Sequence, residues 1–239
     1  LIFVGSIPSI TDRSFTMGTG PEGAAIYANG TTVGATLEFL EYPGEQVQFD
    51  AADLGATLTL GGRNTGNNIF GLKLSDNGAG ATSLVKTGPG TWILNNLNGS
   101  NDFTGSTTIY EGRLVITGDG ALGTKGGSGP PVQLVGGVLD LRGVDYTASG
   151  ADTEDLLLAG GRLDTSSGTS SWAGRIDIVA NTVPNVNVAR DATLTLGTIG
   201  GGGALDKDNF GTLVLNGANT YTGTTRVRDG RLVLDYSTS

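Results

Sequence analysis

Two stretches of this chain, each sixteen residues long, are almost the same. NDFTGSTTIYEGRLVI runs from Asn101 to Ile116, and NTYTGTTRVRDGRLVL runs from Asn219 to Leu234, 118 residues later. Eight of the sixteen positions are identical, and most of the others exchange residues of similar character. Neither stretch contains the residues of a catalytic site. The repetition therefore predicts a structural unit that occurs twice, in which the same letters meet the same neighbours.

A shorter period lies inside this large repeat. The triplets GRL, GVL and GRL begin at Gly112, Gly137 and Gly161, which are 25 and 24 residues apart, and GRL returns at Gly230. Each triplet opens a strand in which apolar and polar residues alternate, so that one face is apolar and the other is polar. The leucines of the triplets are predicted to form one ladder through the core: Leu114, Leu139, Leu163 and Leu232.

Short strands, cut by Gly, Asn and Asp turns at this period, predict a β-solenoid, in which each turn of a coil lays its strands on the turn before. The 42 glycines exclude long helices, because glycine inside a helix costs roughly 1 kcal/mol relative to alanine. A period of about 24 residues predicts an all-β chain of about ten rungs, with a length near 50 Å at roughly 4.8 Å per rung. Stacking stabilises such a chain, because each rung covers the apolar face of its neighbour.

Two kinds of residue are predicted at the corners of the coil. The structural corner glycines are expected to take positive φ, a conformation that only glycine adopts easily. They are Gly112, Gly137, Gly161 and Gly230. Asn101 and Asn219 are expected to cap turns by bonding their own backbone.

The large repeat also organises the chain. Copy one extends over about residues 56–123 and copy two over about residues 192–239, because ATLTLG opens both copies and GTWIL of the first corresponds to GTLVL of the second. Residues 1–239 are interpreted as a single continuous solenoid segment. Since the chain begins at Leu1 without Met and stops just after a strand, it is interpreted as part of a longer polypeptide.

The repeated residues resemble a known family. GPGTWILNNLNGSNDFTGSTTIYEGRLVI and NFGTLVLNGANTYTGTTRVRDGRLVL are similar to the autotransporter-associated β-strand repeat, also called the passenger-associated transport repeat. Its hallmark is G-T-L-x-L followed by N-T-Y-T-G-x-T-x-V-x-x-G-x-L-x-L. Departures are small: Asp102 and Phe103 replace the Thr-Tyr pair, and Trp92 replaces a leucine. The resemblance implies a right-handed parallel β-helix in a large secreted or surface-held bacterial protein, and it implies no catalytic residues.

Charge and composition argue against several classes of function. The net charge is −9 with only four lysines, so nucleic acid would be repelled and is not expected as a partner. The absence of Cys and His removes thiolate and imidazole catalysis and the usual zinc ligands. No cofactor is expected. No segment approaches the roughly 20 apolar residues of a membrane-spanning helix, so no membrane span is expected.

One segment imitates a dinucleotide site. GDGALG, from Gly118 to Gly123, fits G-x-G-x-x-G, and Asp140 follows at the distance of a ribose contact. The residues that follow are rich in Gly and Pro and cannot begin the helix that such a site needs. A loop between rungs is therefore the favoured interpretation.

Carboxylates gather in two stretches, at Glu38, Glu41, Glu45, Asp50 and Asp53, and at Asp152, Glu154 and Asp155. Parallel β-helix enzymes use such residues on polysaccharides, and calcium binds carboxylates weakly at surfaces. No pair of carboxylates recurs with an arginine at the rung spacing, so solvated loop charge is the favoured interpretation. No catalytic or metal-binding residue is predicted.

Two further groups of residues are candidates for a surface role. The arginines that follow the corner glycines are expected to pair with outward acids. They are Arg113, Arg162 and Arg231, with Asp140, Asp164 and Asp235 as partners. Trp92 and Trp172 leave two alternatives open, either packed strand residues or platforms on which a glycan stacks.

These observations predict a structural, non-catalytic, elongated module of a bacterial protein at the outer surface or in the extracellular space: a fibre, a stalk or an adhesin shaft. The exposed strand edges of an uncapped solenoid would pair with a continuation of the same chain or with head-to-tail copies, which would form a filament. A glycan-binding adhesin module with a cell-surface ligand is the alternative. A polysaccharide-active β-helix enzyme is a third interpretation.

Overall fold

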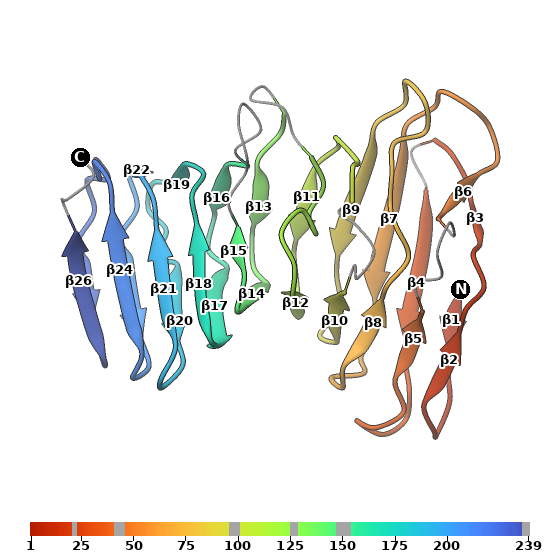
Figure 1. Ribbon diagram of the computed structural model, residues 1–239, viewed down its shortest axis with the longest axis horizontal. Helices are drawn as coiled ribbons and strands as arrows, with labels where there is room; N and C mark the ends of the chain where they lie inside the picture. The colour runs from red at the N-terminus through yellow and green to blue at the C-terminus, as the bar shows by residue number, and fades with distance from the viewer. Residues whose placement is uncertain (21–22, 41–45, 96–100, 125–128, 147–153, 236–239) are drawn as a thin grey trace.

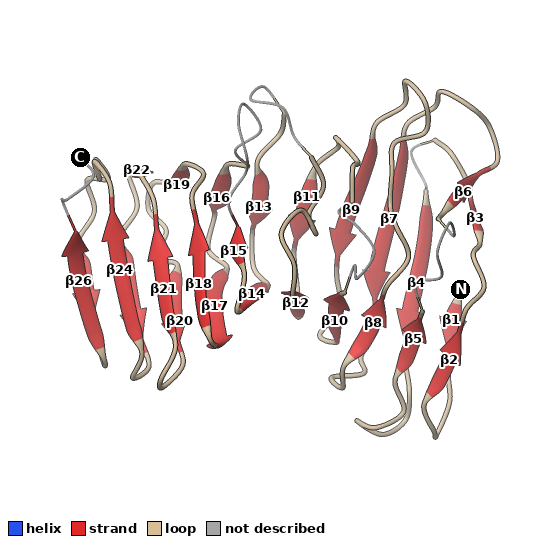
Figure 2. Ribbon diagram, viewed as in Figure 1, coloured by secondary structure: helices blue, strands red, loops and turns tan. Residues whose placement is uncertain are grey.

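The computed structural model describes residues 1–20, 23–40, 46–95, 101–124, 129–146 and 154–235. Within these ranges every regular element is a β-strand and none is a helix (Figure 2). The strands stand side by side along the long axis, and the two ends of the chain lie toward opposite ends of the stack (Figure 1). The coil makes about 8 turns, close to the ten expected. The prediction of an all-β solenoid with parallel strands is confirmed.

Three long parallel sheets form the sides of the coil, and a short fourth sheet precedes one of them. The nine-stranded sheet contains, in order, β1 (Ile2–Phe3), β4 (Ala24–Ala28), β7 (Ala56–Gly61), β9 (Thr82–Lys86), β11 (Thr107–Ile109), β13 (Val132–Leu134), β16 (Leu156–Leu158), β19 (Ile176–Ile178) and β22 (Ile199–Gly201). The ten-stranded sheet contains β2 (Ser9–Thr11), β5 (Leu37–Phe39), β8 (Asn68–Phe70), β10 (Thr91–Leu94), β12 (Arg113–Ile116), β14 (Val138–Arg142), β17 (Arg162–Ser167), β20 (Asn185–Val188), β23 (Leu205–Asp208) and β25 (Thr225–Val227). The five-stranded sheet contains β15 (Asp145–Tyr146), β18 (Thr169–Trp172), β21 (Thr193–Leu196), β24 (Thr212–Asn216) and β26 (Arg231–Asp235), and the two-stranded sheet contains β3 (Thr16–Met17) and β6 (Gln48–Phe49).

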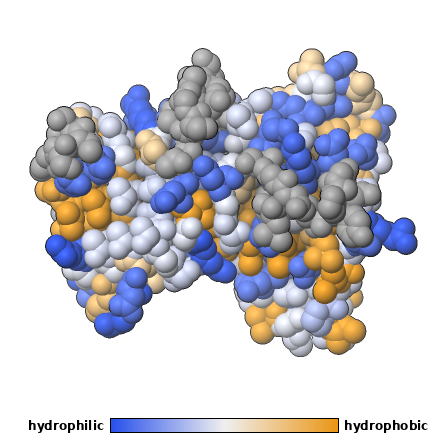
Figure 3. All heavy atoms as spheres, in the orientation of Figure 1, coloured by the Kyte–Doolittle hydropathy of each residue, from blue (hydrophilic) through white to orange (hydrophobic). Residues whose placement is uncertain are grey.

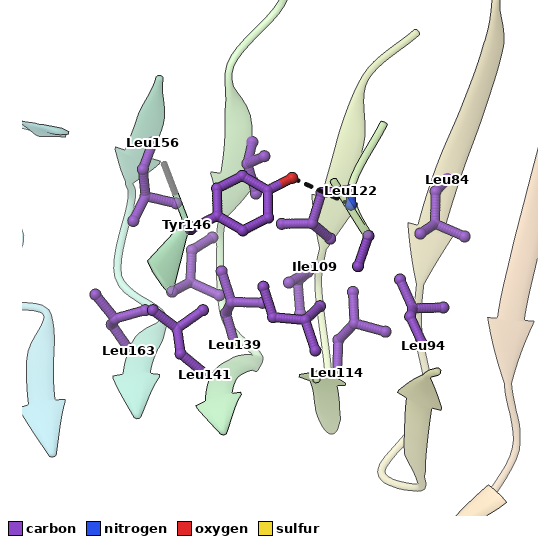
Figure 4. Close-up of a cluster of buried hydrophobic side chains, with 14 of the residues drawn as sticks. Leu84, Leu94, Ile109, Leu114, Leu122, Leu139, Leu141, Tyr146, Leu156 and Leu163 are labelled. Atoms are coloured by element: carbon purple, nitrogen blue, oxygen red, sulfur yellow. Dashed lines mark hydrogen bonds between the residues drawn. The ribbon is translucent and has the colours of Figure 1, made fainter. Parts of the chain in front are cut away.

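Inward-facing side chains stack in register and fill the coil. Leu114 of β12 pairs with Leu139 of β14, which pairs with Leu163 of β17. All three are fully buried, and Figure 4 shows them in one apolar cluster with leucines of the opposite sheet. Full burial of such a side chain contributes about 1.5–3 kcal/mol. The contribution exists only because a neighbouring rung covers each leucine.

Leu232 does not belong to this ladder, which corrects the prediction. After Leu163 the ladder continues through Val186, Lys207 and Val227. Leu232 lies in β26 of the five-stranded sheet and pairs there with Leu213. The step between ladder positions shortens from 25 residues, at Leu114 to Leu139, to 20 residues at the last step. Because the rungs shorten, the second copy of the repeat arrives at a different side of the coil.

Candidate functional site

The later part of each copy of the large repeat, residues 82–116 and 205–235, builds the same unit, which is two rungs thick. The ATLTLG stretches that open the copies are not equivalent, since β7 pairs with β9 and β21 pairs with β24. In copy one β9 and β10 are covered by β11 and β12, and in copy two β23 and β24 are covered by β25 and β26. The internal register agrees, since Trp92 pairs with Leu114 and the equivalent Leu213 pairs with Leu232. Strands β9 to β12 of copy one lie in the nine- and ten-stranded sheets, whereas strands β23 to β26 of copy two lie in the ten- and five-stranded sheets. The same letters therefore meet the same neighbours within the unit, but not outside it.

A buried lysine closes the corner of each unit. The Lys86 ammonium donates to the backbone oxygens of Thr87 at 2.8 Å, Gly88 at 2.7 Å and, one rung further on, Glu111 at 3.0 Å. This uses all three donors of the ammonium group. The side chain is fully buried. We call this arrangement the lysine clasp.

The second copy repeats the lysine clasp at the equivalent position. The Lys207 ammonium donates to the backbone oxygens of Asp208 at 2.9 Å, Asn209 at 2.6 Å and Asp229 at 3.1 Å. Sequence analysis missed both lysines, although a signal was present. Lys86 and Lys207 occupy apolar, inward-facing positions of alternating strands, four residues before the Gly of the Gly-Thr pair in both copies. A cation at such a position must find acceptors inside the fold.

Two of the four predicted corner glycines have positive φ. Gly112 has φ of 66° and Gly230 has φ of 71°. Gly112 follows Glu111 and Gly230 follows Asp229, the residues whose backbone oxygens are the third acceptors of the two clasps. The turn at each glycine directs that oxygen toward the lysine ammonium. The first corner of the clasp is also left-handed, at Gly88 in copy one (φ 66°) and at Asn209 in copy two (φ 65°). Asparagine replaces glycine there because it tolerates this conformation better than most residues.

Gly137 and Gly161 do not have positive φ, which corrects the prediction for them. Close packing requires glycine at both positions instead. A Cβ on Gly137 would lie 2.6 Å from Cγ2 of Ile109, and a Cβ on Gly161 would lie 2.6 Å from Cγ of Leu134. The left-handed turn before the second of these strands is made by Gly160, with φ of 117°.

The predicted turn caps join rungs. Asn101 is buried; its Oδ1 accepts from the backbone N–H of Leu74 at 2.8 Å, and its Nδ2 donates to the backbone oxygen of Ala121 at 2.7 Å. Those partners lie on the turns before and after its own, so Asn101 joins three successive turns of the coil. Asn219 makes one bond of each kind, to Ile199 on the preceding turn and to Gly217 in its own turn.

Trp92 and Trp172 are core residues. Both are fully buried, and their indole N–H groups donate to backbone oxygens, of Gly61 at 2.8 Å and Glu154 at 3.1 Å. Trp172 also stacks on Tyr146, with ring centroids 4.6 Å apart. Neither ring presents a face to solvent, so the interpretation of the two tryptophans as glycan platforms is wrong.

Two aspartates are buried on the outer side of the ten-stranded sheet. Asp140 and Asp164 are neighbours in register, and their side chains are 0% and 1% exposed. Arg113 bridges them, with Nη1 at 2.9 Å from Oδ2 of Asp140 and Nη2 at 2.8 Å from Oδ2 of Asp164. Arg162 holds Asp164 with two bonds, of 2.7 and 2.9 Å. The expected pairing of these two arginines with acids is confirmed, whereas Arg231 lies on the five-stranded sheet.

The dinucleotide-like segment is a loop that enters the core. Ala121 and Leu122 are buried in the apolar cluster, and the Leu122 N–H donates to the Tyr146 hydroxyl at 3.2 Å (Figure 4). No helix begins in the described part of this segment. Asp140 lies beneath Arg113 and is not available to a ribose. The loop interpretation is confirmed for the described residues.

Three carboxylates of the two acidic stretches accept hydrogen bonds from the backbone. Asp50 accepts from the N–H of Thr19, Asp53 from that of Ala79, and Asp155 from that of Arg175. Glu41, Glu45 and Asp152 lie outside the described residues. In the part of the chain that the structure describes, no three acidic side chains come together as metal ligands would. That part also contains no helix long and apolar enough to span a membrane.

Protonation of the first lysine clasp depends on pH. Burial lowers the pKa of the Lys86 ammonium from 10.5 to about 8, against the opposing charge of Glu111. At a pH between these two pKa values, Lys86 is protonated in the unfolded chain and has lost its proton in the folded chain. The free energy of unfolding therefore rises with pH in this range. Between about pH 7.5 and about pH 9.5 we expect the unmodified chain to gain about 1–2 kcal/mol relative to Lys86→Met. Urea denaturation of both proteins measures this gain, and parallel pH profiles would contradict it.

Comparison with known proteins places these features in context. Residues 84–116 and 205–234 match the family model of the passenger-associated-transport-repeat. The chain is also 36% identical over 250 residues to the "Adhesin BmaC autotransporter" of Brucella suis biovar 1 (strain 1330). That match covers 97% of the chain and 7% of the relative's length. No solved structure matches the chain.

Proposed function

This chain carries two passenger-associated transport repeats, and from that premise we propose that it is a structural, non-catalytic segment of the surface-exposed passenger of a bacterial autotransporter adhesin. The lysine clasp is the observation that carries the proposal. Each repeat uses its most distinctive buried polar group to hold backbone oxygens of two successive rungs together. Each of the two lysines therefore serves to join one rung to the next.

The relative supports the coarser part of this proposal. Its printed name describes an autotransporter adhesin, and the chain covers only 7% of its length. We therefore propose that the longer polypeptide, of which this chain is a segment, acts as an adhesin. We assign this segment the role of a shaft that holds other parts of that polypeptide at a distance from the cell surface.

The two ends of the stack support continuation by further rungs of the same polypeptide. At the C-terminal end a depression of about 310 Å³ is lined by Leu215, Tyr221, Leu232 and Leu234, among others. At the N-terminal end a depression of about 270 Å³ is lined by Leu1, Phe15 and Ile26, among others. Apolar residues show on the molecular surface toward both ends (Figure 3). A further rung would bury these groups and pair the free strand edges.

In-frame deletion of the segment tests the structural role. We expect a passenger that lacks these residues to reach the cell surface and to be shorter by about 40 Å, at roughly 4.8 Å for each of about 8 turns. Electron microscopy measures the length, and cleavage by an added protease confirms surface exposure. An unchanged length would contradict the shaft proposal. Loss of a polysaccharide-cleaving activity with the segment would contradict the non-catalytic assignment.

A further inference from the structure

The outer side of the ten-stranded sheet, from β12 to β25, concentrates the arginines of this chain. We name the following residues the arginine face: Arg113, Arg142, Arg162, Arg226 and Arg228. The acids on the same side of these strands are Asp140, Asp164, Asp206 and Asp208. With five arginines and four aspartates, this surface is one charge positive in a chain whose net charge is −9.

On this side of the sheet most of the aspartates lie beneath the arginines. Asp140, Asp164 and Asp206 are buried, whereas the side chains of Arg226 and Arg228 are 62% and 47% exposed. Over these three aspartates an approaching solute meets guanidinium N–H groups first, whereas Asp208 is partly exposed.

Two of these guanidinium groups, those of Arg162 and Arg228, retain donors for a second anion. A guanidinium carries five N–H donors, and a two-point pair with an aspartate uses two of them. Arg162 on Asp164 and Arg228 on Asp206 make such pairs through Nε and Nη2. In these two guanidinium groups Nη1 takes no part in the pair and remains a donor for a second anion, which arginine recognises by hydrogen bonds.

We propose that the arginine face binds an anionic polysaccharide. β12 and β25 are five strand spacings apart, which is roughly 24 Å at about 4.8 Å each. The arginines form two groups along this line, and β20 between them presents the polar amide groups of Asn185 and Asn187. An extended polymer with repeated sulfate or carboxylate groups matches the two groups, and its hydroxyls match the asparagines.

This inference goes beyond the shaft role, and a binding experiment on the isolated chain separates the two. The probes are dextran sulfate, hyaluronan and uncharged dextran of similar length, which distinguish sulfate, carboxylate and sugar alone as the recognised group. We expect the two anionic polymers to bind by calorimetry at about 50 mM salt, to weaken as salt rises, and uncharged dextran not to bind.

A matched pair of variants tests the location. Arg142→Gln with Arg226→Gln removes two members of the arginine face. Arg175→Gln with Arg190→Gln removes the same charge elsewhere, and the side chain of Arg175 is 60% exposed on the nine-stranded sheet. We expect affinity for dextran sulfate to fall about twofold to fivefold for each arginine removed from the face, and by less than twofold in the control.

Several outcomes would overturn the proposal. These are no binding of either anionic polymer at low salt, equal losses in the two double variants, or binding of phosphatidylglycerol vesicles without binding of either polymer. Thermal melting shows whether each variant is folded. If the Arg142→Gln, Arg226→Gln variant is not folded, the single variant Arg226→Gln tests the proposal. Nη1 of Arg226 lies 3.8 Å from Oδ2 of Asp206, so this side chain contributes little to the stability of the fold. The length measured for the passenger is independent of all these results.

Discussion

Gly112→Ala is expected to lower the free energy of unfolding by about 3–5 kcal/mol. A left-handed conformation costs alanine about 1–2 kcal/mol relative to glycine. The remainder is steric, because the new Cβ would collide with the backbone oxygens of Gly88 and Gly90 and would lie 2.7 Å from Nζ of Lys86. The substitution therefore disturbs the corner and the lysine clasp together. The midpoint of urea denaturation, followed by circular dichroism, measures the loss.

Gly143→Ala is the matched control. Gly143 has φ of 62°, close to the 66° of Gly112, but a Cβ there meets no atom within 4 Å. We expect this variant to lose only the conformational part, about 1–2 kcal/mol. Equal losses in the two variants would show that the crowded corner has no special role, and would remove the physical basis for the repeated glycine.

Lys86→Met is expected to lower the free energy of unfolding at neutral pH by about 2–4 kcal/mol. Methionine keeps most of the volume of the side chain but donates no hydrogen bond. Three backbone oxygens, those of Thr87, Gly88 and Glu111, lose their ammonium partner. A buried acceptor that is left unsatisfied costs about 1–3 kcal/mol, and removal of the buried charge offsets part of that loss. Chemical denaturation of the two proteins measures the difference.

Lys73→Met makes the same chemical change outside a clasp. Lys73 pairs with Asp102 at 2.6 Å, and both side chains are well exposed, at 36% and 50%. An exposed pair contributes roughly 0–1 kcal/mol, so we expect a loss below about 1 kcal/mol. Lys207→Met should behave like Lys86→Met, because its three acceptors are equivalent. A small effect for Lys86 and a large one for Lys73 would refute the clasp as a stabilising device.

The architecture could be predicted from local patterns. Alternation of apolar and polar residues, as in Leu114 and Ile116 on one face, specifies a strand with one buried side. Frequent glycine excludes helices, and the period in the twenties predicts a coil. The triplets at Gly112, Gly137 and Gly161 do begin strands that stack in register, as the paired leucines Leu114, Leu139 and Leu163 show. These features depend on residues close together in the chain, so a single sequence reveals them.

The roles of individual side chains could be predicted less well. Trp92 and Trp172 have an apolar ring and one donor, which suits a core position as well as a sugar platform. Gly137 and Gly161 resemble Gly112 in sequence, but they differ in whether the backbone turns or a neighbour crowds the position. Partners from other rungs decide these questions. Those partners lie some 20 to 30 residues away, as Asn101 shows with Leu74 and Ala121.

The sequence by itself determined that this chain is a parallel coil of short strands and that a two-rung unit occurs in it twice, because strand formation and turns follow from local patterns. Only the tertiary structure decided which side of the coil each copy occupies, since that depends on the summed lengths of all the rungs between Leu114 and Val227. It also decided that Lys86 and Lys207 are buried with three acceptors each. A charged group enters the core only where the next rung supplies the oxygen that completes its bonds, and no local pattern specifies that rung.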